Sequence, residues 1–254
     1  MKFLQTITYL MLSTFMLVSC NNNGGSSNGS ASTSSSSGAS GSGNDYYYES
    51  TVTTTGKDLN MSEVVKMYVS AKGDMRTEAD VRSSMNGNKV TAPIIMIGKA
   101  DKPTESIDID DSAKSYTINQ IDTGKIENSE MKINSTATKI GNETIMGFNC
   151  VHARVIANHS MGKFYNSSDT VDIWKSNDVP ILASLKNKLD KMGGTGLYSA
   201  ETAQQLKDMG CSGMTVKMTS NSAGAHVIDQ LTKVERKDFP ASLFEIPAGY
   251  KQDK

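Results

Sequence analysis

Alternation of apolar and polar side chains predicts β-strands in the first half of the chain. One alternating run covers residues 65–71 and a second covers residues 75–81, with the turn pair Gly73-Asp74 between them. Two such runs across a short turn are typical of a β-hairpin that turns one face toward water. Further short apolar segments extend to Ile118, and Pro93 places the first of them at an edge or a bulge. This spacing indicates an antiparallel meander.

The strand pattern continues in the second half and changes phase once. A run over residues 136–140 is followed by the turn pair Gly141-Asn142 and by a longer run over residues 144–157. The apolar parity of the longer run shifts at Cys150-Val151, which predicts a bulge or bend there. A further strand contains Trp174.

Two helices are predicted late in the chain. Residues 181–192 place their apolar side chains on one helical face and end at Gly193-Gly194. A second helix is expected between Ser199 as N-cap and Gly210. A single antiparallel sheet with two helices inserted late, against its concave face, is an α+β architecture.

The N-terminus has the pattern of an export signal. Lys2 precedes an uncharged, mostly apolar run over residues 3–18, which is too short for a comfortable membrane-spanning helix. The run closes with Leu17-Val18-Ser19-Cys20, which resembles the lipobox of bacterial lipoproteins. That resemblance implies that Cys20 is acylated and becomes the mature N-terminus. The alternative is an ordinary cleaved signal without a lipid.

A low-complexity segment separates this signal from the rest of the chain. Residues 21–44 contain only Asn, Gly, Ser, Ala and Thr, so they cannot bury enough apolar surface to offset their ordering entropy. The composition changes at Asp45. We therefore expect a signal peptide over residues 1–19, the lipidated cysteine and a flexible tether over residues 20–44, and one domain over residues 45–254.

Charge and motif content narrow the classes of partner and of chemistry. The net charge of −1 argues against a nucleic-acid partner, and no run after residue 20 is long enough to span a membrane. His152, His159 and His226 lack metal-ligand spacing, and no phosphate-binding loop or nucleophile elbow is present. We expect a monomer without enzymatic activity, cofactor or metal.

Cys150 and Cys211 are the two thiols of the predicted domain. An exported protein lies in a compartment that permits a disulfide between them. Two separately buried thiols are the alternative, because the sequence alone does not bring the two α-carbons within bonding reach.

Two motifs carry most of a resemblance to a known family, which the hairpin over residues 67–76 and the strand that contains Trp174 share. The ending over residues 239–251 contains Phe-Glu-Ile-Pro-Ala-Gly-Tyr-Lys, and residues 141–150 follow the pattern G-x-E-T-I-x-G-aromatic-x-C. Both are similar to an uncharacterised family of exported bacterial lipoproteins, many of them from Bacteroidetes. That family resembles the LolA/LolB lipoprotein carriers in shape, which implies an antiparallel half-barrel with a concavity for acyl chains. The triplets around Ser112 and Thr170 resemble the O-glycosylation acceptor motif of Bacteroidetes, which implies modification of these two residues.

These observations leave two hypotheses for function. The first is an envelope lipoprotein that binds a lipid or acyl chain in the half-barrel. The second is a structural lipoprotein with a filled core that presents a surface to another envelope protein. Asn21, rather than Asp, follows Cys20, which favours the periplasmic face of the outer membrane. Strand and helix parity gives nine residues as candidates to line the cavity: Met67, Val69, Met75, Phe148, Trp174, Leu185, Leu189, Met214 and Met218.

Overall fold

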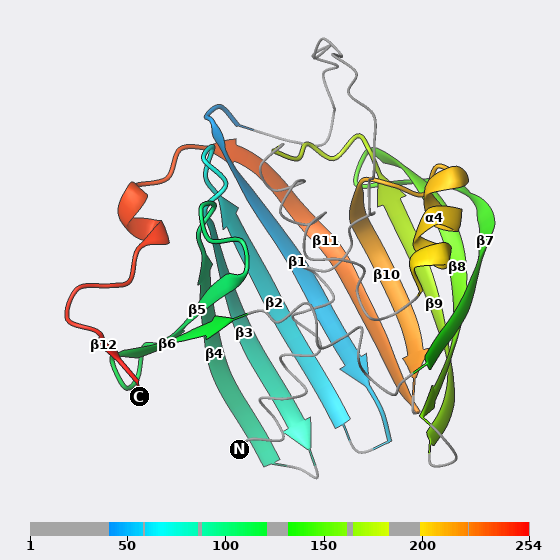
Figure 1. The fold of residues 1–254 in the computed structure, drawn as a ribbon, viewed down its shortest axis with the longest axis horizontal. Coiled ribbons are helices and arrows are strands. Elements are labelled where there is room, and N and C mark those ends of the chain that lie inside the picture. Colours follow the sequence, from blue (N-terminus) through cyan, green and yellow to red (C-terminus); the bar gives the residue numbers. More distant parts are fainter. Residues whose placement is uncertain are drawn as a thin grey trace.

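The fold is built on one large open β-sheet. The computed structural model describes residues 41–253, apart from residues 58, 86–87, 121–131, 162–164, 183–198 and 223. Twelve strands are hydrogen-bonded in the order β12-β6-β5-β4-β3-β2-β1-β11-β10-β9-β8-β7, and helix α4 packs on one face near β7 and β8 (Figure 1). All neighbours are antiparallel except the short pair of β12 and β6. The elements are β1 (Asp45–Thr55), β2 (Leu59–Val69), β3 (Met75–Met85), β4 (Asn88–Gly98), β5 (Glu105–Asp110), β6 (Ser115–Gln120), β7 (Lys132–Ile145), β8 (Phe148–Met161), β9 (Tyr165–Ser176), α4 (Ala200–Asp208), β10 (Met214–Ser222), β11 (Ala225–Lys237), the 3-10 helix η1 (Ala241–Phe244) and β12 (Lys251–Gln252).

The hairpin predicted at Gly73-Asp74 is confirmed as β2 and β3. Val69 pairs with Met75, and the turn is closed by the Gly73 N–H, which donates to the Ser70 carbonyl oxygen over 2.8 Å. Odd-numbered residues of β2 are buried from Met61 onward, while their even-numbered neighbours reach solvent more. This alternation is the period of two that a half-buried strand requires.

The predicted turn at Gly141-Asn142 is wrong, because β7 runs straight through it. The chain reverses instead at Met146 and Gly147, whose φ angles are 54° and 80°. A two-residue hairpin turn matched to the sheet twist needs positive φ at both central positions. The irregularity lies in β7 between Lys139 and Gly141, opposite the point where the buried parity of β8 changes. The expected bulge therefore exists, but in the partner strand.

Helix α4 is the second of the two predicted helices, and its N-cap is confirmed. The Ser199 hydroxyl accepts a hydrogen bond from the Thr202 N–H, and the helix buries Ala203 and Leu206. The first predicted helix, over residues 181–192, falls largely outside the described residues. The part of the chain that the structure describes therefore contains one α-helix, and no helix in it is long and apolar enough to cross a membrane.

The C-terminal segment, residues 239–251, closes one end of the sheet. The Asp45 carboxylate accepts the Phe239 N–H over 2.8 Å through one oxygen and the Ala71 N–H over 2.7 Å through the other. The ring of Phe239 packs edge-on against both Tyr68 and the buried Phe244. The segment that carries the sequence signature therefore ties the first strand and the β2–β3 turn to the end of β11.

Replacing Gly213 by alanine is expected to destabilise the fold by about 2–4 kcal/mol. The φ of +85° costs an alanine about 1 kcal/mol, and its Cβ would lie 2.2 Å from the Ser176 carbonyl oxygen, which adds about 1–3 kcal/mol. Gly210→Ala is the matched control, because Gly210 has a φ of +77° but no atom within 4 Å of the position that a Cβ would take. Urea unfolding of the two variants measures the difference. Equal losses of unfolding free energy in the two variants would show that the backbone at Ser176 of β9 shifts to accept the added Cβ at no energetic cost.

Candidate ligand-binding site

One face of the sheet, here called the α4 face, packs against the helix. Ala153, Ile173 and Met218 share a buried cluster with Ala203 and Leu206 of α4. A row of directly paired residues continues from this cluster across the sheet toward β3. Met218 pairs with Asp229 of β11, Asp229 pairs with Val52 of β1, and the pairing goes on through β2. Side chains that pair directly across strands point to the same face. The resulting central row of buried residues crosses seven strands: Val81, Glu63, Val52, Asp229, Met218, Ile173 and Ala153.

Two carboxylates occupy the middle of this otherwise apolar row. Glu63 is 1% exposed and Asp229 is 4% exposed, and Val52 of β1 lies between them. Both oxygens of Glu63 and the Oδ1 atom of Asp229 are buried without a hydrogen-bond partner. Adjacent strands are about 4.8 Å apart, so the two α-carbons are separated by about 10 Å. Both side chains can therefore contact one small polar group that lies over Val52 on the α4 face.

Burial shifts the protonation of both groups. Desolvation raises the pKa of Glu63 to about 7, and the nearby charge of Asp229 adds to the rise. Desolvation also raises the pKa of Asp229 to about 7, against the lowering effect of the Ser50 hydroxyl. Near neutral pH the pair therefore holds about one proton and carries about one negative charge.

The surroundings of the pair are apolar with a few hydroxyls. Val52, Val65 and Ala79 form a buried cluster, and three partly buried apolar side chains pack against it: Ile94, Met96 and Val227. The Ser50 hydroxyl, two residues before Val52 on the same face, is fully buried; it lies near enough to Asp229 to lower the pKa of that carboxyl, but its geometry does not make a hydrogen bond. An unpartnered buried polar group costs about 1–3 kcal/mol, so several of them in one apolar region require an explanation.

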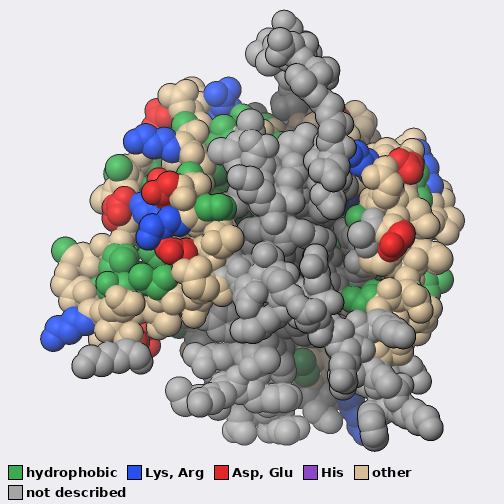
Figure 2. All heavy atoms as spheres, in the orientation of Figure 1, with side chains coloured by type: hydrophobic (Ala, Val, Ile, Leu, Met, Phe, Trp, Pro, Cys, Tyr) green, Lys and Arg blue, Asp and Glu red, His purple; other side chains and the backbone are tan. Residues whose placement is uncertain are grey.

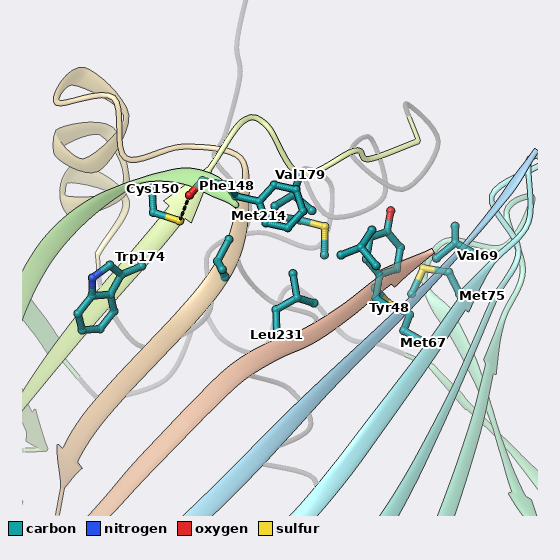
Figure 3. Packing of buried hydrophobic residues seen from close by; sticks show 12 residues of the cluster. Tyr48, Met67, Val69, Met75, Phe148, Cys150, Trp174, Val179, Met214 and Leu231 are labelled. Carbon is teal, nitrogen blue, oxygen red and sulfur yellow. Dashed lines mark hydrogen bonds between the residues drawn. The ribbon is translucent and has the colours of Figure 1, made fainter. Parts of the chain in front are cut away.

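Most of the predicted cavity residues pack against one another instead. Six of the nine belong to one buried group of twelve residues, the Phe148 cluster, where β2 ends and β8 begins (Figure 3): Met67, Val69, Met75, Phe148, Trp174 and Met214. Met218 lies in the central row, and Leu185 and Leu189 lie outside the described residues. Figure 3 shows Phe148, Met214 and Val179 in close proximity, with Trp174 to one side of Cys150.

Trp174 faces away from α4. Its neighbour Ile173 packs on the α4 face, and successive strand residues point to opposite faces. The Trp174 ring stacks on His152 with centroids 4.0 Å apart, and the Lys217 Nζ atom lies 4.9 Å from the Trp174 ring centroid. The His152 Nδ1 atom lies 3.1 Å from Glu143 Oε1, and its Nε2 atom lies 3.1 Å from Asp172 Oδ1. The tryptophan therefore joins the Phe148 cluster to a polar group formed by His152, Asp172 and Lys217.

No disulfide joins Cys150 and Cys211, so the bonded alternative is corrected to two buried thiols. The Cys150 thiol donates to the Phe148 carbonyl oxygen over 3.5 Å, within the Phe148 cluster. The Cys211 thiol donates to the Val151 carbonyl oxygen over 3.6 Å and packs with Leu206 on the α4 face. The thiols belong to different buried clusters, and burial raises the pKa of Cys150, which disfavours a reactive thiolate.

The remaining predicted positions are dispersed. Ser112 lies in the exposed turn between β5 and β6, and its hydroxyl donates to Asp110 over 2.6 Å. Thr170 lies within β9, paired with Ile156 on one side and with Asn221 on the other. Within the described ranges no group of three or more His, Cys, Asp or Glu residues could hold a metal ion. Cys20 lies outside the described residues.

A shallow cleft is present on the face opposite α4. Its volume is about 150 Å³, and residues of β2, β3 and β4 line it, among them Lys66, Glu78 and Pro93. Ligand pockets usually measure about 300–1,000 Å³. On the described part of the face drawn in Figure 2, acidic and basic side chains are interspersed. Neither feature competes with the central row as a candidate site.

Comparison with known proteins identifies the family. The model of a family described as "Domain of unknown function (DUF4412)" matches residues 51–250. The chain belongs to this DUF4412 family. Membership in an uncharacterised family, predicted from the sequence, is thereby confirmed. The DUF4412 match begins within β1 and ends inside the C-terminal segment, so it includes both carboxylates. No curated protein matches the chain.

Several solved structures resemble this DUF4412 chain over most of their length. LprF from Mycobacterium bovis is 10% identical, with a TM-score of 0.37, and the match covers 81% of this chain and 90% of LprF. A LolA superfamily protein from Nitrosomonas europaea is 6% identical, with a TM-score of 0.32 and coverage of 81% and 92%. A DUF1329 family protein from Desulfovibrio piger is 11% identical, with a TM-score of 0.26 and coverage of 80% and 90%.

Proposed function

We propose that this DUF4412 chain is an envelope lipoprotein whose half-barrel sheet binds a lipid or acyl chain against the α4 face. The observation that carries the proposal is the group of buried, unpartnered polar atoms on Glu63, Asp229 and Ser50 within an apolar face. A packed core gains nothing from such groups, since each of them costs free energy. A ligand that supplies both apolar contact and hydrogen bonds compensates for that cost.

The same proposal assigns the N-terminal segment of the chain to delivery. Acylation of Cys20 anchors the chain at the periplasmic face of the outer membrane, and residues 21–44 tether a single domain over residues 45–254. Two or three acyl chains bind a membrane far more strongly than one, which is only marginal. The protein acts as a monomer and catalyses no reaction.

The second candidate function is an interaction lipoprotein with a filled core. The Phe148 cluster favours it, because six predicted cavity residues are 0–8% exposed and pack against each other. In this case the α4 face has no small-molecule ligand, and a neighbouring envelope protein is the partner.

Native mass spectrometry of the full chain decides between the two. The lipoprotein is extracted from its own host in a fluorinated surfactant, which mixes poorly with alkyl chains. We expect a non-covalent adduct of lipid size that is lost on denaturation, and saturable uptake of dodecanol by the emptied protein. A bare mass together with no uptake of dodecanol would reject the binder and favour a protein partner.

A further inference from the structure

The unpartnered atoms of the central row specify what the ligand must supply. Glu63 Oε1, Glu63 Oε2 and Asp229 Oδ1 are carboxyl oxygens, and an ionised carboxylate only accepts hydrogen bonds. Because the pair shares about one proton near neutral pH, it has about one donor beside three unpartnered acceptor oxygens, so the ligand must supply mainly donors. A ligand headgroup made of acceptors, such as a carboxylate or a phosphate, would meet like charge in a region of low dielectric.

The charge of the site points in the same direction. The residues that pair with Glu63 are Val81 and Val52, and those that pair with Asp229 are Val52 and Met218. None of these neighbours is basic, so the row does not neutralise the carboxylates internally. A buried anion is stabilised when a cation with good hydrogen-bond geometry joins it.

A metal ion fits the site less well than an organic cation. Calcium takes six to eight oxygen ligands, and no group of three or more ligating side chains occurs in the described ranges. A primary ammonium carries three donors on one nitrogen and a single positive charge. The buried cluster of Val52, Val65 and Ala79, here called the Val52 cluster, lies beside the pair, and Met96 packs against it. These apolar side chains can contact an alkyl chain attached to the ammonium.

We propose that the central row is the headgroup site for an ammonium-bearing amphiphile, with Glu63 and Asp229 accepting hydrogen bonds from its nitrogen above Val52. This inference rests on the proposed binding of an apolar ligand at the α4 face and specifies its chemical class. Ser50 supplies a further buried hydroxyl that can accept or donate beside Asp229 in the same site. The alkyl chain of the ligand lies on the Val52 cluster.

Three probes of equal chain length test the inference on the full chain in the fluorinated surfactant. Dodecylamine, dodecanol and dodecanoate carry a cationic, a neutral and an anionic headgroup. We expect dodecylamine to bind at least tenfold more tightly than dodecanol by calorimetric titration, and dodecanoate to bind more weakly than either. Equal affinity for the amine and the alcohol would overturn the inference while leaving the proposed function intact. Absence of binding by all three would reject both.

Isosteric variants locate the effect. Glu63→Gln and Asp229→Asn keep the shape of the side chain and remove the charge, so each is expected to lower dodecylamine affinity at least tenfold and to lower dodecanol affinity by a much smaller factor. Asp80→Asn is the matched control, because Asp80 is exposed on β3 and pairs with Val64 on the opposite face. Retained amine preference in both central-row variants, or its loss in Asp80→Asn, would contradict the assignment.

Discussion

Lowering the pH from 8 to 5 is expected to stabilise this protein, in contrast to the acid sensitivity of most folds. The pKa values of Glu63 and Asp229 are raised to about 7 by burial, whereas their ordinary values are 4.5 and 3.8. Below about pH 4 both groups are protonated in the folded and unfolded states, and the stability is fully present. As pH rises, the unfolded chain ionises first, and stability falls until pH passes about 7. From below pH 4 to above pH 7 each group contributes about 3–4 kcal/mol, of which about 2–3 kcal/mol falls between pH 5 and pH 8.

The double variant Glu63→Gln, Asp229→Asn isolates this effect. Its two amides do not titrate, so we expect it to be more stable than the wild type at pH 8 by several kcal/mol, with a smaller difference at pH 5 and a close match only below about pH 4. Urea unfolding at both pH values measures the difference. The comparison with wild type is essential, because partly exposed carboxyls such as Glu235, paired with Lys233, have lowered pKa values and act in the opposite direction. A variant that is less stable than the wild type at pH 8 would contradict the burial of ionised groups.

Truncating Phe148 to alanine is expected to cost about 3–5 kcal/mol of unfolding free energy. The ring is fully buried at the start of β8. It belongs to the Phe148 cluster, whose other members include residues of β1, β2, β3, β9, β10 and β11. Removal of the ring leaves a cavity that six strands would have to close together. Chemical denaturation followed by tryptophan fluorescence provides the measurement.

Ile156→Ala is the control for this experiment. Ile156 lies on the same strand but is 44% exposed, so we expect a loss below about 1 kcal/mol. If Phe148→Ala lost no more unfolding free energy than Ile156→Ala, the Phe148 cluster would be loosely packed. That outcome would also move the ligand cavity of the proposed function toward this end of the sheet.

The sequence predicted strands well where polar and apolar residues alternate strictly. The β2–β3 hairpin follows from such a pattern, and α4 follows from its N-cap and its apolar face. The turn at Gly141-Asn142 failed, because glycine and asparagine favour turns without excluding a strand, and no contact at Gly141 requires a glycine. The chain turned where the twist of β7 and β8 demanded positive φ at two residues.

The candidate site was missed because its residues look like surface residues in the sequence. Glu63 shares the buried parity of Met61 and Val65, and Asp229 that of Val227 and Leu231, so a charged residue in the buried register was the available sign. What the sequence did not contain was the pairing that brings them together. β1 lies between them, and its run of Ser and Thr residues shows little apolar alternation. Pairing of β1 with β11 is a property of the whole chain rather than of either segment.

The position of β1 determines when this fold can close. β1 lies between β2 and β11. One edge of β1 can pair with β2 early, but its other edge stays unpaired until β11, the last long strand, has been added. The contact between the Asn44 N–H and Asp238 spans 194 residues. A chain that emerges N-terminus first, from a ribosome or through a membrane channel, therefore holds an open strand edge until residue 237 has followed. The central row is assembled at that same late step, so a chain interrupted before β11 has one carboxylate and no site.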